Sequence, residues 1–381
     1  SDTTLDRILK QCHSFVANPD SNYMDDIFAQ KLKAFSNPAF SSEDQKKLCT
    51  YHHKLILTEV IPAYQELADS LESLRGTGKS SRGLAFFEGG REYYLYLLQS
   101  QTGTYVPVGQ IEKRLSAQLL SDYREISSLL KQNSSLINRL NQCSGELTLT
   151  PTQMLEKLPE LMKKDFPELK DATYELRTVH PSMKKFLSPA FYLTPPVDTR
   201  TPNVIYINDS GRTSSLELFG TLAHEGFPGH LYQTVSFAEN NPSDIRYLVT
   251  SSGYVEGWAT YVESYGYEYA ASLMNDPDSA KNAVRFAWLN RSMNLCIYSL
   301  IDIGIHYRGW DASRTAVFLK AFGINNASTA AEIYQYIVET PGNYLKYYWG
   351  YLNFLDLKTV CQKRLGDDFD LKEFHRRILD I

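Results

Sequence analysis

Apolar side chains recur at intervals of three and four residues along most of the chain, the spacing of α-helices with one buried face. Residues 5–145 follow this helical pattern, and their clearest run predicts a long amphipathic helix that bends at Pro62 and ends at Gly76. The residues of that run are Leu57, Val60, Ile61, Tyr64, Leu67 and Leu71. Helical spacing resumes after a break at Asn240-Asn241-Pro242 and continues to residue 381. The pattern therefore predicts a mostly α protein.

The spacing changes between residues 170 and 210. Polar and apolar residues alternate over 174–179, a short apolar run occupies 204–207, and prolines crowd between them. Alternation and short apolar runs bounded by prolines are typical of β-strands. We therefore expect two or three strands of a small sheet immediately before the next apolar helix.

That next helix carries the strongest chemical signal of the chain. Residues 216–230 begin with the pattern of a buried helix and then supply the pair His224-Glu225 and, six residues after the first histidine, His230. Zinc hydrolases place a ligand and a general base together in this way, but their two histidines are usually four residues apart. On a straight helix, a spacing of six would separate the histidines by roughly 240° and about 9 Å. One ion cannot join two imidazoles so placed, so the helix must change course.

The intervening residues allow such a change. Pro228 cannot continue the helical hydrogen-bond pattern, and Gly226 and Gly229 adopt backbone angles that other residues resist. We predict a bulge or kink over 226–229 that returns His230 to the side of His224. If the helix simply ended there and His230 pointed away, the metal hypothesis would lose its second ligand.

A third ligand is expected from the segment 254–263. Glu256 and Glu263 are seven residues apart, which places them about 20° apart on one helical face beside the small side chain of Ala259. Two carboxylates on a buried face need a cation or strong hydrogen-bond donors. Two histidines with Glu256 suit zinc and leave a fourth position for water, and Glu263 is the alternative third ligand. In the competing interpretation both histidines are ordinary half-buried residues and Glu256 is solvated.

Polar residues also interrupt the apolar helix predicted over 281–310. Asp302 and His306 are four residues apart and close enough to pair, which would fix the histidine tautomer for a functional or a purely structural role. Arg291 needs a partner within that helix, and the candidates are Glu263 and a substrate carboxylate.

These motifs resemble the bacterial "domain of unknown function 885" family, which is grouped with the gluzincin-type zinc peptidases. The resemblance covers roughly residues 75–381. It depends on the segments 224–230 and 256–263, together with the following positions: Gly83, Leu84, Glu92, Tyr93, Tyr94, Tyr192, Pro195, Pro196, Asn208, Arg291, Asp302, Gly304, His306, Pro341, Gly342, Tyr347, Gly350, Phe369, Asp370, Leu371, Phe374 and His375.

The resemblance implies an elongated, gluzincin-like helical domain with a small sheet beside the zinc helix, whose edge strand lines a cleft and pairs with an extended peptide. On the residues alone, a hairpin that only packs on the helices is an equal alternative. The implied zinc ligands are His224, His230 and Glu256, with Glu225 as the general base. Tyr347 or His306 would donate to the oxyanion, although Tyr344 and Tyr348 neighbour Tyr347. Substrate-binding roles are expected for Arg291, Tyr206 and Asn208.

The function expected from this set is zinc-dependent hydrolysis of amide bonds in short peptides, as a carboxypeptidase or dipeptidase. Two positions depart from the family pattern: Gln335 replaces an arginine, and Asn343 replaces a glutamine. The loss of that arginine favours an alternative, a peptide-binding protein without turnover. A further alternative directs the zinc chemistry at esters or non-peptide amides.

Composition restricts the remaining possibilities. The net charge of −5 argues against a broad surface for nucleic acid or anionic membranes. The five cysteines are widely spaced, which predicts free thiols rather than disulfides or a sulfur-bound metal. No apolar run approaches the ~18 residues of a membrane span.

The expected organisation has a helical amino-terminal part, residues 1–145, and a catalytic part, residues 146–381, that together form one continuous domain. The chain begins without an initiator methionine or signal peptide, and family members are generally longer at that end. We therefore expect a carboxy-terminal piece of a longer bacterial protein. Its location is either cytoplasmic or exported and anchored at the cell surface through a removed amino-terminal segment. The sequence indicates no oligomeric state.

Overall fold

A computed structural model describes residues 1–35, 41–78 and 80–380 and divides the chain into two compact units, residues 1–81 and 82–381. The sequence suggested a division near residue 145, whereas the helices between residues 90 and 146 belong to the same compact unit as the metal-site segments. Among the described residues, no helix is long and apolar enough to span a membrane.

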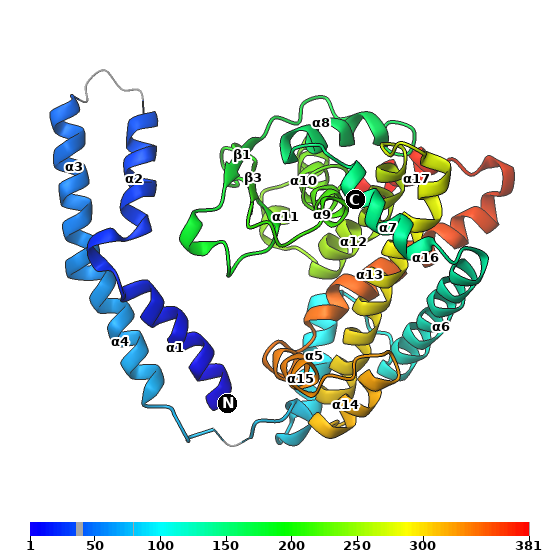
Figure 1. The fold of residues 1–381 in the computed structure, drawn as a ribbon, viewed down its shortest axis with the longest axis horizontal. Helices are drawn as coiled ribbons and strands as arrows, with labels where there is room; N and C mark the ends of the chain where they lie inside the picture. The colour runs from blue at the N-terminus through cyan, green and yellow to red at the C-terminus, as the bar shows by residue number, and fades with distance from the viewer. Residues whose placement is uncertain (36–40, 79, 381) are drawn as a thin grey trace. The chain divides into compact units, whose positions relative to one another are not determined.

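The described residues of the first unit form the helices labelled α1 to α4 in Figure 1. They are α1 (Asp2–Val16), α2 (Tyr23–Ala34), α3 (Ser42–Leu55) and α4 (Ile61–Glu72). A π-helical turn, Ile56–Val60, joins α3 to α4, so the predicted long helix exists but begins earlier than its apolar run suggested. Pro62 lies in the first turn of α4, where its missing N–H costs little, and the chain turns at Gly76 with a φ of +72°.

The second unit is also mostly helical, as predicted. Its helices are α5 (Gly90–Thr102), α6 (Val108–Gln132), α7 (Leu136–Glu146), α8 (Pro151–Met162), α9 (Ser215–Glu225), α10 (His230–Glu239), α11 (Ile245–Leu248), α12 (Ser252–Ala271), α13 (Pro277–His306), α14 (Ala312–Lys320), α15 (Ala327–Glu339), α16 (Asn343–Leu365) and α17 (Leu371–Leu379). One hydrophobic core runs through this unit, with Trp258, Trp288 and Phe219 among its largest buried side chains.

The predicted small sheet is present and has three strands, β1 (Glu175–Thr178), β2 (Ala190–Leu193) and β3 (Val204–Ile207). Their order is β1-β3-β2, with β1 parallel and β2 antiparallel to the central β3. Both β1 and β2 are therefore edge strands, and β2 contacts α9. Figure 1 shows β1 and β3 on the same side of this unit as α9 and α10.

Helix α12 lies between two helices that approach it closely at glycines. A Cβ on Gly257 would fall 2.5 Å from the backbone of Gly350 in α16, and a Cβ on Gly266 would fall 2.5 Å from the Cβ of Ala223 in α9. Because neither glycine has a side chain, α12 touches both neighbours with its backbone. This packing sets the register between α9, α12 and α16, which carry most of the site described next, and α10 supplies one further residue.

Candidate metal centre

The helix breaks between α9 and α10, as the sequence predicted. α9 ends at Glu225 and α10 begins at His230, so the four residues between them lie outside both helices. The indole N–H of Trp258 donates to the carbonyl of Pro228 at 2.9 Å and ties the junction to α12. As a result, the rings of His224 and His230 lie with centroids 4.8 Å apart and planes at 88°.

Glu256 meets both histidines at this point. Its Oε2 lies 3.7 Å from Nε2 of His224 and 3.5 Å from Nε2 of His230. Among the described residues, one ligand atom from each of these three side chains lies within 4.8 Å of the others. Two imidazole nitrogens and one carboxylate oxygen at this spacing are a donor set that suits a divalent metal such as zinc. The structure therefore brings the three predicted ligands together.

Glu263 occupies the position behind His224. Its Oε2 lies 3.3 Å from Nδ1 of His224, while Nε of Arg291 donates to its other oxygen at 3.0 Å. Of the two partners that the sequence left open for Arg291, the structure thus shows Glu263. A carboxylate that accepts a hydrogen bond from one ring nitrogen of a histidine fixes the tautomer in which the other nitrogen can bind a metal. Glu263 therefore supports a ligand in this geometry.

The electrostatic field at the cluster favours positive charge. Burial alone would lower the pKa of His224, but hydrogen bonds with Glu256 and Glu263 and the charge of Glu225 raise it to about 10. Burial opposes ionisation of Glu256, yet the two histidines hold the pKa of that carboxyl below its usual value. A site that stabilises an imidazolium so strongly also attracts a metal cation.

Glu225 points from the end of α9 towards the sheet. Its Oε2 accepts the backbone N–H of Tyr192 at 2.9 Å, and Tyr192 lies on the edge strand β2. The residue adjacent to the first histidine thus connects the metal cluster to a sheet edge.

Helix α16 contributes two polar side chains near Glu256, those of Tyr347 and Lys346. The ring of Tyr347 lies 6.4 Å from that of His224, and burial together with the charge of Glu256 raises the pKa of its phenol. Nζ of Lys346 lies 3.6 Å from Oε1 of Glu256. Sequence reasoning singled out Tyr347 but not Lys346, whose only signal was its position beside that tyrosine.

The predicted pair of Asp302 and His306 is not formed, and this expectation was wrong. The Asp302 carboxylate accepts the backbone N–H of Gly342 and the hydroxyl of Tyr94. The two ring nitrogens of His306 bond to the backbone N–H of Leu84 and the carbonyl of Ile337. His306 is fully buried with both nitrogens engaged, so its predicted role as oxyanion donor has no support in this geometry.

Tyr206 and Asn208 are also outside the cluster. Successive strand residues face opposite sides of a sheet. Ile205 faces the α9–α10 junction near Gly226, whereas its neighbour Tyr206 stacks on Phe191 with centroids 5.1 Å apart. The amide of Asn208 donates to the carbonyls of Lys184 and Leu187 and thereby holds a loop. Both residues thus make contacts away from the three candidate ligands, and their substrate-binding roles stay predictions.

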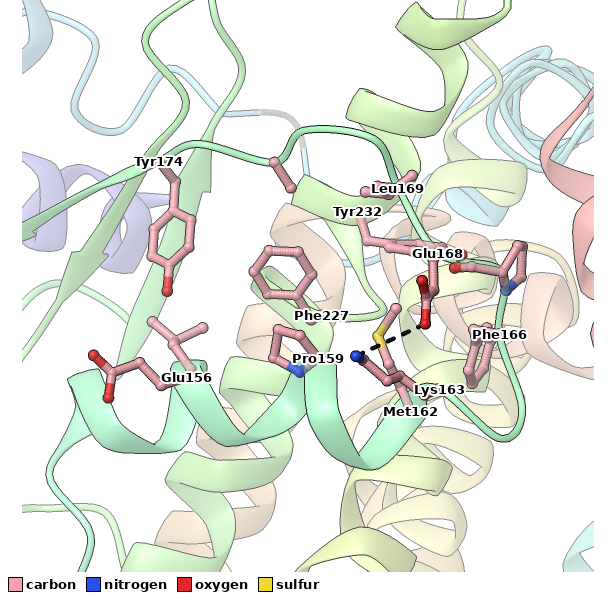
Figure 2. Close-up of a pocket in the computed structure, with 13 residues that line it drawn as sticks. Glu156, Pro159, Met162, Lys163, Phe166, Glu168, Leu169, Tyr174, Phe227 and Tyr232 are labelled. Carbon is pink, nitrogen blue, oxygen red and sulfur yellow. Dashed lines mark hydrogen bonds and ion pairs between the residues drawn. The ribbon is translucent and has the colours of Figure 1, made fainter.

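A separate cavity of about 330 Å³ lies behind the α9–α10 junction (Figure 2). Its walls come from α8, the connection 163–174 and the residues Phe227 and Tyr232. Figure 2 shows mostly apolar side chains there, with Lys163 and Glu168 near one another at 3.8 Å. None of the three candidate metal ligands lines it, so this cavity is distinct from the metal centre.

The fold and the cluster define a mostly helical protein with a candidate divalent-metal centre. Residues 2–381 match the family described as "Bacterial protein of unknown function (DUF885)", and the chain belongs to this family. The match confirms the resemblance found in the sequence and extends it into the first unit. A search of curated proteins gives no match.

Two solved structures share the fold. A "putative lipoprotein" from Colwellia psychrerythraea is 21% identical with a TM-score of 0.82, over 100% of this chain and 69% of that one. A "putative lipoprotein of unknown function" from Shewanella oneidensis is 17% identical with a TM-score of 0.61, over 92% of this chain and 67% of that one. At these identities the likeness concerns the fold.

Proposed function

We propose that this protein is a zinc-dependent hydrolase that cleaves amide bonds in short peptides, in the manner of a gluzincin-type peptidase. The observation that carries the proposal is the convergence of His224, His230 and Glu256 on one point, with the charge of the neighbouring Glu225 acting on His224. A His-His-Glu set with a glutamate directly after the first histidine is the arrangement of zinc peptidases.

The residues present fit a zinc ion. His224 and His230 would bind through Nε2, Glu256 through Oε2, and Glu263 would hold His224 in the required tautomer. When bound, zinc polarises a carbonyl and makes water a stronger acid, which is the chemistry that amide hydrolysis requires. Zinc is preferred to magnesium or calcium because two of the three donors are imidazoles.

Glu225 supplies the general base in this scheme. It would accept a proton from the attacking water and pass it to the leaving amine. Its hydrogen bond to Tyr192 holds one carboxylate oxygen at the edge of β2. A peptide extended along that edge would present its backbone to Glu225 and would be bound with little demand on its side chains. The Tyr347 phenol, whose ring lies 6.4 Å from that of His224, would donate to the carbonyl oxygen as it gains charge.

Metal analysis and a hydrolysis assay test the proposal together. The full chain should contain close to one zinc per molecule after dialysis against zinc and should hydrolyse a mixed dipeptide library. A chelator should abolish the hydrolysis, and added zinc should restore it. Zinc binding without hydrolysis would instead support the hypothesis of a peptide-binding protein without turnover. Cleavage of esters but not of peptides would support the alternative of an ester hydrolase.

The descriptions of the two solved relatives support a proposal about location as well. Both are described as lipoproteins in name, and we propose that this chain also acts outside the cytoplasm, held at a membrane surface by a lipid-anchored segment. Fractionation of the producing bacterium would find the protein with membranes. Recovery in the cytoplasmic fraction would contradict this.

A further inference from the structure

The ammonium group of Lys346 is the one feature of the cluster that the zinc scheme leaves without a task. Its Nζ lies 3.6 Å from Oε1 of Glu256, the oxygen that does not face the histidines, and 5.0 Å over the ring of Tyr347. The Lys346 side chain is only 23% exposed. A half-buried ammonium beside a metal ligand has no role in holding the metal, because like charges repel.

The charges of the cluster show what this ammonium can do. When a dication is bound to neutral histidines, its two charges and those of Lys346 and Arg291 exceed the three negative charges of Glu225, Glu256 and Glu263 by one. The loaded site therefore attracts an anionic group.

The two cations are not equally free to meet that anion. Arg291 donates through Nε to Glu263, which in turn holds His224, so movement of Arg291 would disturb a metal ligand. Within the part of the chain that the structure describes, Lys346 forms its ion pair with Glu256, and a bound dication would compete for the charge of that carboxylate. The lysine side chain is also flexible, because its ammonium group stands at the end of a four-carbon chain of single bonds.

We propose that Lys346 binds the free carboxylate of a carboxy-terminal residue, so that the site releases the last residue of a peptide or splits a dipeptide. This inference rests on the proposed function and replaces the earlier expectation that Arg291 anchors the terminus. In such a substrate only the nitrogen and Cα separate the scissile carbonyl from the terminal carboxylate, a span of roughly 3–4 Å from standard bond lengths. Oε2 of Glu256 lies 3.5 Å from Nε2 of His230, and Oε1 of the same carboxylate lies 3.6 Å from Nζ of Lys346. The histidines and the ammonium therefore flank one carboxylate, and we expect one short substrate to reach both sides.

The test compares free-acid and carboxy-amidated forms of the same dipeptide with the zinc-loaded full chain. The wild type should favour the free acid, and Lys346→Met should lower kcat/KM for the free acid about 10–100-fold, mainly through KM. The same variant should change kcat/KM for the amidated dipeptide by no more than about twofold. Lys346→Arg should recover part of the loss. Lys363→Met, at an exposed position of the same helix, is the matched control and should change neither substrate.

Two further readouts separate this inference from the proposed function. Lys346→Met should bind zinc at least as tightly as the wild type, because it removes a cation next to Glu256. An N-acetyl amino acid should bind the zinc-loaded wild type more tightly than its amide in calorimetry, and Lys346→Met should abolish the difference. If Lys346→Met still prefers the free acid to the amide as strongly as the wild type does, in turnover or in binding, the proposed role of Lys346 is overturned. No hydrolysis by any form, with discrimination in binding intact, overturns the proposed hydrolase and keeps the anchor.

Discussion

Nδ1 of His224 lies 3.3 Å from Oε2 of Glu263, and this contact determines which nitrogen of the histidine faces Glu256. Arg291 neutralises the other oxygen of Glu263, which is almost fully buried. The charge of Arg291 and the contact with His224 keep the pKa of Glu263 below its usual value in spite of burial. The carboxylate therefore stays ionised at neutral pH and can accept a hydrogen bond from the Nδ1–H group of His224.

Replacement of this support should weaken metal binding without removing a ligand. Glu263→Ala should lower zinc affinity about 10–100-fold, the usual effect of losing a carboxylate behind a ligating histidine. Competition with a chelating dye measures the change. Glu256→Ala is the comparison and should reduce zinc occupancy far more, because it removes a direct donor. Equal losses in the two variants would instead make Glu263 a ligand.

The general base can be tested without disturbing the metal. Glu225→Gln keeps the shape of the side chain and an oxygen for the Tyr192 N–H, but it cannot take a proton. The variant should retain its zinc and lose about 10²–10⁴-fold in kcat, the range that general-base catalysis supplies. Zinc content and single-turnover rates provide the measurement. Full activity in this variant would rule Glu225 out as the base.

Tyr347→Phe should separate oxyanion stabilisation from packing. Removal of one such donor typically costs about 10²–10³-fold in kcat, with zinc content unchanged. Tyr348→Phe is the control, because the hydroxyl of Tyr348 is buried against Ser292 and Asp122 instead of the metal cluster. It should lower stability by about 1 kcal/mol and leave kcat unaltered. An identical kcat in both variants would remove Tyr347 from the mechanism.

The elements of the site that were predicted correctly depend on local properties of the sequence. Helical spacing and a proline between two glycines suffice to predict a helix that must break at 226–229. The seven-residue spacing of Glu256 and Glu263 is likewise fixed within one helix. Local geometry of this kind does not depend on what packs around it.

The predictions that failed concern contacts between residues that are far apart in sequence. Asp302 and His306 are correctly spaced to pair, but each found partners from distant segments, including Gly342 and Ile337. Lys346 reaches Glu256 only because α12 and α16 touch at Gly257 and Gly350, which are 93 residues apart in sequence. Contacts between segments that are distant in sequence produce no periodic pattern that a single sequence could show.

The α9–α10 junction depends on the absence of a side chain at Gly229. A Cβ there would fall 1.8 Å from the carbonyl oxygen of His224, which no local adjustment accommodates. Gly229→Ala should therefore displace His230 and reduce both zinc occupancy and thermal stability. Gly145→Ala, in the helix α7 with open space around it, should be neutral or stabilise the protein by up to about 1 kcal/mol. Normal zinc binding by Gly229→Ala would contradict the proposed role of the junction.

The stability of the fold should depend on pH through a histidine outside the metal centre. His375 is fully buried, with Nδ1 bonded to the carbonyl of Asp165 and Nε2 to the hydroxyl of Tyr261. Burial lowers its pKa from 6.5 to about 4. Between these values the unfolded chain binds the proton and the folded chain does not. The contribution of neutral His375 is therefore complete above pH 6.5 and is lost as the pH falls through about 4.

The lost contribution amounts to about 3 kcal/mol, since each pKa unit corresponds to about 1.4 kcal/mol. Denaturant unfolding of wild type and His375→Gln at several pH values isolates it, because other groups cancel in the difference. The stability advantage of the wild type should shrink by about that amount between pH 7 and pH 4. The comparison of wild type with Asp302→Asn should show the opposite dependence on pH. Burial raises the pKa of Asp302 to about 7, so the stability of the wild type relative to this variant should fall as the pH rises from about 4 to 7. Parallel pH profiles for wild type and His375→Gln would show that His375 titrates alike in both states.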